Sequence, residues 1–283
     1  MCLRRAHGDE SLPSAPPPQP SPLGGGGDGW GGTFWPMKAE RRTGLFVAGT
    51  DTGVGKTLIT AGLSYALRIM GIDVGVMKPV ETGCPTRAGR LRPLDALTLR
   101  EAAESRDALD LINPYRFHEP LAPMVAAERS GRRIDVGRLE ERFARLTDRH
   151  SVVLVEGAGG LLTPITEETS CLDLAVRLQL PLLVVIGSRL GALNHARLTV
   201  EAALHARVPV AGAILNHFHV DRSAARTTNL PALRQLLPVP LLGEIPHLAP
   251  IRGQALWRHP LLQRPLARSL RQLLPETIAG DET

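Results

Sequence analysis

Cysteine is scarce in this sequence, and it contains no long apolar segment. The 283 residues include only three cysteines, Cys2, Cys84 and Cys171, which are odd in number and lie far apart along the chain. That spacing matches neither a zinc site nor a disulfide framework, so we expect a reducing, cytoplasmic compartment. No apolar run approaches the roughly 20 residues that a membrane-spanning helix requires, and we therefore expect no membrane contact.

Positive charge is in modest excess and is not concentrated in one segment. The formal net charge is +5, from 33 Lys and Arg residues against 28 Asp and Glu residues. The arginines are spread along the chain, and aromatic residues do not alternate with the basic ones in the tail after Arg252. Single-stranded nucleic acids are bound by basic grooves with aromatic stacking, so we expect no nucleic-acid partner.

Residues 1–42 differ in composition from the rest of the chain. A proline-rich stretch covers 13–22, and a glycine run covers 24–27. Such a segment buries too little apolar surface to offset its ordering entropy, and it lacks the continuous apolar stretch of a signal peptide. We expect residues 1–42 to be either a disordered leader or a segment upstream of a start at Met37, and residues 43–283 to form a single domain.

Apolar strand-like runs alternate with segments of helical periodicity from Leu45 onward. Near-continuous apolar runs such as 152–155 and 182–186 indicate strands that are buried on both faces. The alternation predicts an α/β fold, a parallel sheet with helices on both faces, in which ligands bind at the carboxyl ends of the strands. The C-terminal tail predicts an amphipathic helix that Pro260 and Pro265 interrupt. The expected strands are 45–49, 74–80, 151–156, 182–187, 210–215 and 239–243. The expected helices are 57–70, 95–105, 136–149, 170–179, 194–206 and 223–237.

The most informative stretch is the glycine-rich turn at 49–57, between the first expected strand and the first expected helix. Small residues let backbone N–H groups surround an anion, and the helix N-terminus adds partial positive charge. Lys56 is placed to reach the β- and γ-phosphates of a nucleotide, and the Thr57 hydroxyl to ligate Mg²⁺. The spacing departs from G-x-x-x-x-G-K-[ST], because Gly49 lies one residue early and Thr50 takes the first glycine position. The context still predicts a phosphate-binding loop, and with it a fold of the P-loop NTPase type.

Charged side chains occur at two further strand ends and after a proline turn. Lys78 lies in the run 74–80, where a lysine either extends to water or takes part in a phosphate site. Glu156 closes the run 151–156, as the acid of a Walker B segment does, and is placed to reach Mg²⁺ directly or through water. Asp95 follows a proline turn, where it either caps a helix or ligates Mg²⁺, and spacing does not separate these alternatives.

Three other segments offer polar groups at strand ends or in loops. The turn at 187–195 leads from a strand into a helix, and the helix N-terminus is a ready site for a substrate carboxylate. Asn216 ends the next strand with a side chain that offers both a donor and an acceptor to a purine. The stretch 113–123 contains three prolines and is typical of a structured loop, which composition alone does not assign to a pocket.

Taken together, these motifs resemble those of the dethiobiotin synthetase family, the ATP-dependent carboxylases of biotin synthesis. They occur in family order, cover about residues 44–250, and are specific as a set although each is weak alone. The matching segments are 49–57, 78–80 with 82–83, 95–97, 113–115, 156–160, 190–195 and 242–246.

The resemblance implies a reaction of 7,8-diaminononanoate (7,8-diaminopelargonate), CO₂ and MgATP. In this family a carbamate forms on one amine and is phosphorylated to a carbamic–phosphoric anhydride. The second amine then closes the cyclic urea of dethiobiotin and releases phosphate. No covalent nucleophile is needed, because both reacting groups belong to substrates. The resemblance also implies a homodimer with the substrate site at its interface.

The resemblance further assigns roles to individual residues. Lys56 and Lys78 would be catalytic, by neutralising the charge that builds on the phosphate and carbamate. Thr57, Asp95 and Glu156 would hold Mg²⁺. The nucleotide would contact Gly53, Val54, Gly55, Lys56, Thr57, Leu58, Asp95, Glu156, Gly157, Ala158, Gly159, Asn216, His217, Pro246, His247 and Leu248. The substrate would contact Thr52, Thr82, Leu190, Gly191 and Asn194.

Three departures from the family pattern bear on these roles. Thr82 stands where serine also occurs, so the hydroxyl survives with an added methyl group. His217 follows Asn216 where an acidic residue can occur, which leaves its nucleotide contact open. The sequence diverges after Pro246, and we carry over no role beyond Leu248.

Two other families share the predicted fold. Switch ATPases of the partitioning and septum-positioning type carry Lys-Gly-Gly-x-Gly-Lys-Thr, but Asp51 occupies the aligned position of their signature lysine. Amidoligases of cobalamin synthesis carry a C-terminal glutaminase domain with a nucleophilic cysteine, and this sequence has no cysteine after residue 250. Both differences favour the dethiobiotin synthetases.

Overall fold

The computed structural model describes residues 44–220 and 223–273. The expectations of a disordered leader and of a start at Met37 fall on residues 1–42, which lie outside the described residues. The last ten residues of the C-terminal tail, 274–283, lie outside them as well.

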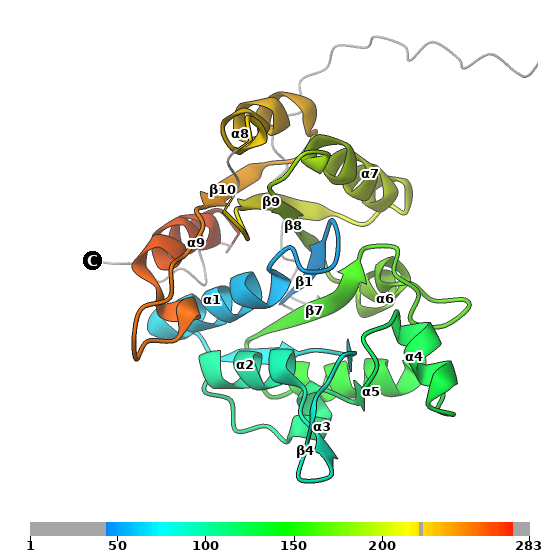
Figure 1. Cartoon of the computed structure of the whole chain (residues 1–283). Helices are drawn as coiled ribbons and strands as arrows, with labels where there is room; N and C mark the ends of the chain where they lie inside the picture. Colours follow the sequence, from blue (N-terminus) through cyan, green and yellow to red (C-terminus); the bar gives the residue numbers. More distant parts are fainter. Residues whose placement is uncertain (1–43, 221–222, 274–283) are drawn as a thin grey trace, which may run out of the picture. The chain divides into compact units, whose positions relative to one another are not determined.

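A parallel sheet of six strands forms the centre of the described part, with β1 (Gly44–Gly49) among its inner strands (Figure 1). Every pair of neighbouring strands in it is parallel. The strand order is β10 (Leu241–Ile245), β9 (Val210–Asn216), β8 (Leu182–Gly187), β1, β7 (Val152–Gly160) and β2 (Val74–Met77). The predicted α/β fold with a parallel sheet is confirmed.

Apolar residues cover both faces of the inner strands. Phe46 and Val47 are adjacent on β1 and fully buried, yet they belong to two separate core clusters, one on each side of the sheet. Successive side chains of a strand point to opposite faces. A strand that is buried on both faces therefore reads as a continuous apolar run, which is the pattern that predicted this sheet.

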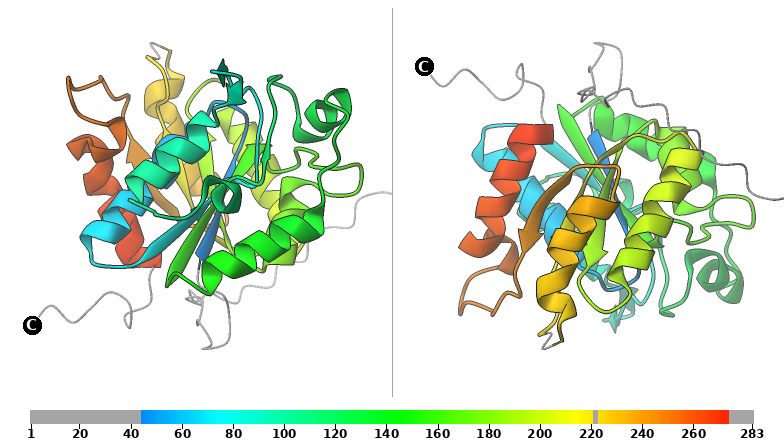
Figure 2. Two further views of the ribbon diagram at one scale, coloured as in Figure 1. Left: turned by 90° about the horizontal axis from the view of Figure 1, so that it is seen from below. Right: turned by 90° about the horizontal axis from the view of Figure 1, so that it is seen from above.

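Helices cover both faces of the sheet (Figure 2). The core cluster around Val47 is shared with α1 (Lys56–Ile69), α2 (Leu94–Ala102) and α9 (Pro260–Leu273). The cluster around Phe46 is shared with helices of the other face. These are α4 (Pro123–Arg129), α5 (Val136–Thr147), α6 (Cys171–Leu178), α7 (Ala192–His205) and α8 (Ala225–Leu236). The layered arrangement exposes the carboxyl ends of the strands at one end, where the sequence places its charged residues.

Short elements fill the connections around these layers. They are α3 (Leu109–Ile112), the 3₁₀ turn η1 (Leu256–Arg258), the parallel pair β3 (Val80–Glu81) with β6 (Tyr115–Arg116), and the hairpin of β4 (Thr86–Arg87) with β5 (Arg90–Leu91). The stretch 113–123 was expected to be a loop, but β6 and the start of α4 lie within it. None of the helices in 44–220 and 223–273 combines the length and apolar character that crossing a bilayer requires.

Most expected boundaries differ from the observed ones by one to three residues, and three expectations that bear on the site or the tail were wrong. The strand expected at 74–80 ends at Met77, so Lys78 follows it. The strand β7 continues through its glycines to Gly160, which pairs with Gly49, so Glu156 lies within the strand rather than at its end. Pro265 does not interrupt the C-terminal helix α9, and Pro260 begins it. Leu262, Leu266 and Leu270 of α9 are fully buried against the core, and this burial outweighs the hydrogen bond that a proline removes.

Candidate active site

The turn between β1 and α1 depends on glycine at three positions. Gly53 and Gly55 have φ values of 75° and 95°, in the left-handed region that favours glycine. A Cβ on Gly55 would lie 2.2 Å from Nδ2 of Asn216, and a Cβ on Gly49 would lie 2.9 Å from Nζ of Lys56. Gly49, one residue earlier than the usual pattern, thus admits the lysine close to the backbone.

Lys56 begins α1 and is almost fully buried, with 6% of its surface exposed. Its Nζ donates hydrogen bonds to the backbone oxygens of Asp51, at 3.0 Å, and Gly159, at 2.7 Å. Burial, together with the charge of Lys78, lowers the pKa of Lys56 to about 8. No side chain of the described residues caps the N-terminus of α1. The lysine and the N–H groups of the first turn are the features that the predicted anion site requires, and anion binding there stays a prediction.

A connected polar cluster lies where β2, β7 and α1 meet. Nζ of Lys78 lies 2.5 Å from Oε1 of Glu156 and 2.9 Å from Oδ2 of Asp95. Oγ1 of Thr57 donates to the same Oε1 of Glu156 at 2.8 Å. Burial opposes the charge of Lys78, but Glu156 and Asp95 outweigh it and raise its pKa. Burial likewise opposes the charge of Asp95, but Lys78 outweighs it and lowers the pKa of that carboxyl. Both partners of the Lys78–Asp95 pair are therefore ionised at neutral pH.

The second carboxylate oxygen of Glu156 has the chemistry of a cation ligand. Oε2 of Glu156 is buried, and no described residue gives it a hydrogen bond. A buried charged oxygen without a partner is costly, and hard oxygen donors of this kind are what Mg²⁺ prefers. The structure brings together Thr57, Asp95 and Glu156, the three predicted metal ligands, and they fit a magnesium ion. Among the described residues, no group of three or more His, Cys, Asp or Glu side chains is placed to hold a metal ion.

Glu81, which the sequence analysis did not single out, caps the N-terminus of α2. Its Oε1 and Oε2 accept hydrogen bonds from the backbone N–H groups of Asp95 and Ala96, each at 2.9 Å. The N-cap position itself is Pro93, which provides no side-chain bond. Burial raises the pKa of Glu81 to about 7. Of the two alternatives for Asp95, capping is therefore wrong, and its carboxylate remains available to Lys78 and to a cation.

Asn113 fixes the backbone that carries Lys78. Its Nδ2 donates to the backbone oxygens of Lys78, at 2.7 Å, and Tyr115, at 3.1 Å. The N–H of Lys78 donates to the oxygen of Ile112 at 2.8 Å. The motif at 113–115 thus acts on the site through the position of Lys78.

The remaining predicted nucleotide contacts of β7 and α1 surround these lysines. The backbone oxygen of Gly157 lies 3.4 Å from Nζ of Lys78. The oxygen of Ala158 accepts a hydrogen bond from Sγ of Cys171 at 3.2 Å. Val54 is buried in the loop, and Leu58 is half-buried in the first turn of α1. Their contact with a nucleotide stays a prediction.

The predicted substrate contacts are all accessible or half-buried. Thr52 lies exposed in the phosphate loop, and Thr82 is half-buried after β3. Leu190 is 89% exposed, and Asn194 is exposed on the first turn of α7. Gly191 is the N-cap of α7, with φ of 91° and no side-chain cap among the described residues. This N-terminus accordingly has free N–H groups for a carboxylate, although the substrate contacts themselves remain predictions.

An ion pair that sequence reasoning missed joins the phosphate loop to the turn before α7. Nη2 of Arg189 lies 2.5 Å from Oδ2 of Asp51. Burial opposes the charge of Asp51, but the N–H of Thr52 and the Arg189 guanidinium lower its pKa. Asn229 of α8 donates to the backbone oxygen of Arg189 at 3.1 Å. Asp51 is thus paired within the chain.

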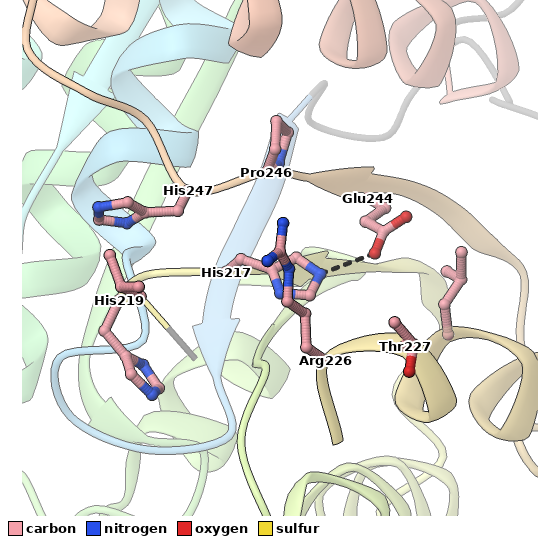
Figure 3. A pocket seen from close by; sticks show the side chains of 9 residues that line it. His217, His219, Arg226, Thr227, Glu244, Pro246 and His247 are labelled. Atoms are coloured by element: carbon pink, nitrogen blue, oxygen red, sulfur yellow. Dashed lines mark hydrogen bonds and ion pairs between the residues drawn. The ribbon is translucent and has the colours of Figure 1, made fainter. Parts of the chain in front are cut away.

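A cavity of about 720 Å³ opens beyond the ends of β9 and β10 (Figure 3). It is lined by His217, His219, Val220, Arg226, Thr227, Leu230, Glu244, Pro246 and His247. Asn216 lies beside it, is 2% exposed, and donates from Nδ2 to the backbone oxygen of Val54 at 2.8 Å. Three predicted nucleotide contacts, His217, Pro246 and His247, therefore line one cavity next to the phosphate loop, while Leu248 is buried.

Sequence comparisons place the chain among known proteins. Residues 43–255 match the family described as AAA domain. The ATP-dependent dethiobiotin synthetase BioD of Thermodesulfovibrio yellowstonii is 38% identical over 215 residues, which cover 73% of this chain and 90% of the relative. The protein of the same name from Anaeromyxobacter dehalogenans strain 2CP-C is 43% identical over 209 residues, which cover 73% of this chain and 92% of the relative.

Solved structures confirm the fold class. The septum site-determining protein MinD from Pyrococcus horikoshii, complexed with Mg-ADP, is similar at a TM-score of 0.55 and 17% identity, covering 85% of this chain and 99% of that one. A ParA family ATPase from Chlorobium tepidum is similar at a TM-score of 0.50 and 14% identity, covering 81% and 99%. Likeness at such low identity shows a shared fold alone, whereas the sequence relatives decide the family. The chain belongs to the family of the ATP-dependent dethiobiotin synthetases.

Proposed function

We propose that this chain converts 7,8-diaminononanoate and CO₂ to dethiobiotin, with hydrolysis of ATP to ADP and phosphate. The observation that carries the proposal is the cluster of Lys78, Glu156, Asp95 and Thr57 beside a phosphate loop. The cluster occurs in a chain that is 38% and 43% identical to proteins named ATP-dependent dethiobiotin synthetase.

The proposed chemistry joins two amines through one carbon atom. One amine adds to CO₂ and loses a proton, which gives a carbamate. A carbamate oxygen attacks the γ-phosphorus of ATP, the bond from that phosphorus to the β-phosphate oxygen breaks, and ADP leaves. The second amine attacks the carbonyl carbon, the bond to the phosphate oxygen breaks, and the amine loses a proton as the cyclic urea forms. All bonds form between substrates, so the protein contributes positioning and electrostatic stabilisation.

The two buried lysines supply the positive charge for these steps. Lys78 stays charged because the negative charges of Glu156 and Asp95 stabilise its ammonium group. Asn113 fixes the backbone that carries Lys78. We assign it to the negative charge shared by the carbamate and the transferred phosphoryl group. Within the described residues the hydrogen bonds of Lys56 Nζ go to backbone oxygens, and we assign this lysine to the β- and γ-phosphates, which would replace those weaker partners.

We assign a magnesium ion to Thr57, Asp95 and Glu156, which the unpartnered Oε2 of Glu156 supports. When bound there, Mg²⁺ neutralises charge on the β- and γ-phosphates. We further place the nucleotide base in the cavity beside Asn216 and the substrate carboxylate at Gly191, in a homodimer that completes the substrate site. A cytoplasmic location belongs to the proposal, and the free thiols of Cys84 and Cys171 support it.

The first test is phosphate release from MgATP by the purified protein, with and without the diamine and bicarbonate. Release that requires both, with dethiobiotin identified by mass spectrometry, supports the proposal. Phosphate release that does not depend on the diamine but increases with DNA or a partner protein would instead favour a switch ATPase. Light scattering coupled to gel filtration tests the homodimer, and a monomeric mass for the active enzyme would contradict it.

A further inference from the structure

We propose that Glu244, acting through His217, makes this protein select nucleotides whose base carries an exocyclic amino group. The inference rests on the proposed function in one respect, because it takes the cavity beyond β9 and β10 to hold the base of the nucleotide. It gives a role to Glu244, to which the resemblance assigned none, and a specific one to His217.

Glu244 and His217 form one hydrogen-bonded unit on the cavity wall (Figure 3). His217 follows the last residue of β9, and its backbone N–H donates to the oxygen of Ile245 at 2.9 Å. Nε2 of His217 lies 2.7 Å from Oε1 of Glu244 on β10. The histidine side chain is 8% exposed and the glutamate side chain 36% exposed. Glu244 belongs to β10, and the backbone bond to Ile245 holds His217 directly after β9, so the pair lies at the ends of two neighbouring strands.

The carboxylate of Glu244 determines which ring nitrogen of His217 carries the proton. An ionised carboxylate accepts hydrogen bonds and donates none, so Nε2 of His217 must be the protonated nitrogen. In a neutral ring, Nδ1 then has no proton and is a hydrogen-bond acceptor. No described residue bonds this nitrogen. Glu244 thus leaves an acceptor available on a residue that lines the cavity.

The base of a nucleotide that is bound at the phosphate loop would reach this cavity. Asn216 bonds the phosphate loop at Val54 and directly precedes His217, so the loop and the cavity wall are adjacent. Adenine carries an amino group at its C6 position, whereas hypoxanthine carries a carbonyl oxygen there. An acceptor nitrogen bonds the amino group and repels the carbonyl. Arg226 also lines the cavity and is a donor, which would favour the carbonyl, so the two side chains make opposite predictions.

The test compares MgATP with MgITP, which differ at this position of the base. The assay is diamine-dependent phosphate release at about pH 8. We expect kcat/KM for ATP to exceed that for ITP by about tenfold or more, because a site that is built to bond a substrate group rejects the analogue without it. A ratio near or below one would overturn the proposal and assign base selection to Arg226.

Two variants test whether the His217–Glu244 pair acts through the acceptor nitrogen of His217 or only stabilises the fold. In Glu244→Gln the amide N–H₂ can donate to Nε2 and so stabilise the other tautomer, whose Nδ1 is a donor. We expect the ATP to ITP ratio to fall at least about fivefold, the loss of roughly one hydrogen bond. His217→Phe keeps an aromatic ring without the acceptor and should lower the ratio in the same way. Glu140→Gln removes an equivalent charge on α5 and should leave the ratio unchanged.

A binding measurement separates failure of this inference from failure of the proposed function. Titration calorimetry with MgADP and MgIDP needs neither the diamine nor turnover. If diamine-dependent release is absent but MgADP still binds more tightly than MgIDP, the proposed reaction fails and the selection by Glu244 stands. If release is normal but folded Glu244→Gln and His217→Phe both keep the wild-type ratio, the selection fails and the reaction stands.

Discussion

Lys78 bonds both carboxylates that are expected to hold Mg²⁺, and we expect it to act in the chemical step. Its ammonium lies 2.5 Å from Glu156 and 2.9 Å from Asp95, while Lys56 faces the phosphate loop. In Lys78→Gln the positive charge is lost, and kcat should fall by about 100- to 1000-fold, the range for removal of one oxyanion donor. Diamine-dependent phosphate release measures this loss, and calorimetry with MgADP should show nucleotide binding retained.

The control for Lys78→Gln is Arg68→Gln, which removes a positive charge from an ion pair with Glu104 on the outside of α1. It should leave both measurements near the wild-type values. Turnover of Lys78→Gln within a few-fold of wild type would remove Lys78 from the mechanism. Loss of MgADP binding in that variant would instead reassign Lys78 to nucleotide binding.

Glu81 satisfies two backbone N–H groups at the start of α2 and so frees Asp95. In Glu81→Ala both acceptors are lost, and the free energy of unfolding should fall by about 1–2 kcal/mol, as for loss of a helix cap. Because Asp95 loses the support of its backbone, more Mg²⁺ should be needed for half-maximal activity. Urea unfolding and a Mg²⁺ titration of phosphate release measure the two effects. Glu101→Ala, at an exposed position of the same helix, should change neither, and equal effects of the two variants would contradict the capping role.

Sequence reasoning singled out those residues of the candidate site whose signal is local. Lys56, Lys78 and Glu156 each stand beside an apolar run, and lysine occurs only three times in the sequence, so two of the three lie in the candidate site. Glu81 and Glu244 were missed because their roles depend on partners 14 and 27 residues away. No periodicity shows such a pairing, which arises only when strand ends meet in the folded chain.

The two glycines of the phosphate loop with left-handed backbone angles, Gly53 and Gly55, have different surroundings. At Gly53 a Cβ would meet no atom within 4 Å, whereas at Gly55 it would meet Asn216. Gly53→Ala should lower the free energy of unfolding by about 1–2 kcal/mol, the cost of a left-handed alanine. Gly55→Ala should lower it by about 3 kcal/mol, because it also displaces the buried bond from Asn216 to Val54. Urea unfolding of both variants checks the difference, and equal losses would show that only backbone strain matters.

The elements themselves were more predictable than their ends. The strand at 182–187 and the helix at 57–70 were found almost to the residue, because buried apolar runs and helical periodicity are strong over such lengths. The end of β7 was placed too early because glycine is a weak strand former, yet Gly160 pairs with Gly49. The two-residue strands β3 and β6 were missed because so short a segment has no period to detect.

Across the whole molecule, the two ends of the sheet differ in chemistry. The carboxyl ends carry the lysines and carboxylates of the site. At the amino ends of β2 and β7, His150 bonds Asp73 through Nδ1, at 3.0 Å, and Asp107 through Nε2, at 2.7 Å. Burial opposes the charge on the ring, but the hydrogen bonds and charges of the two carboxylates outweigh it and raise the pKa of His150. One imidazole thus joins three connections that are far apart in the sequence.

This arrangement predicts how the stability of the protein depends on pH. A histidine whose pKa is raised on folding stabilises the folded state fully below its unfolded pKa, about 6.5, and loses that contribution as the pH rises through the folded value. The gap in unfolding free energy between wild type and His150→Gln should therefore be larger at about pH 5.5 than at about pH 9. Urea unfolding at both pH values measures it. His205→Gln is the control, because His205 is exposed at the end of α7 and its ring bonds a backbone oxygen. A gap that stays constant or widens with pH would show that His150 acts as a neutral hydrogen-bonding group. In that case, the amino end of the sheet would not depend on ionisation of the ring.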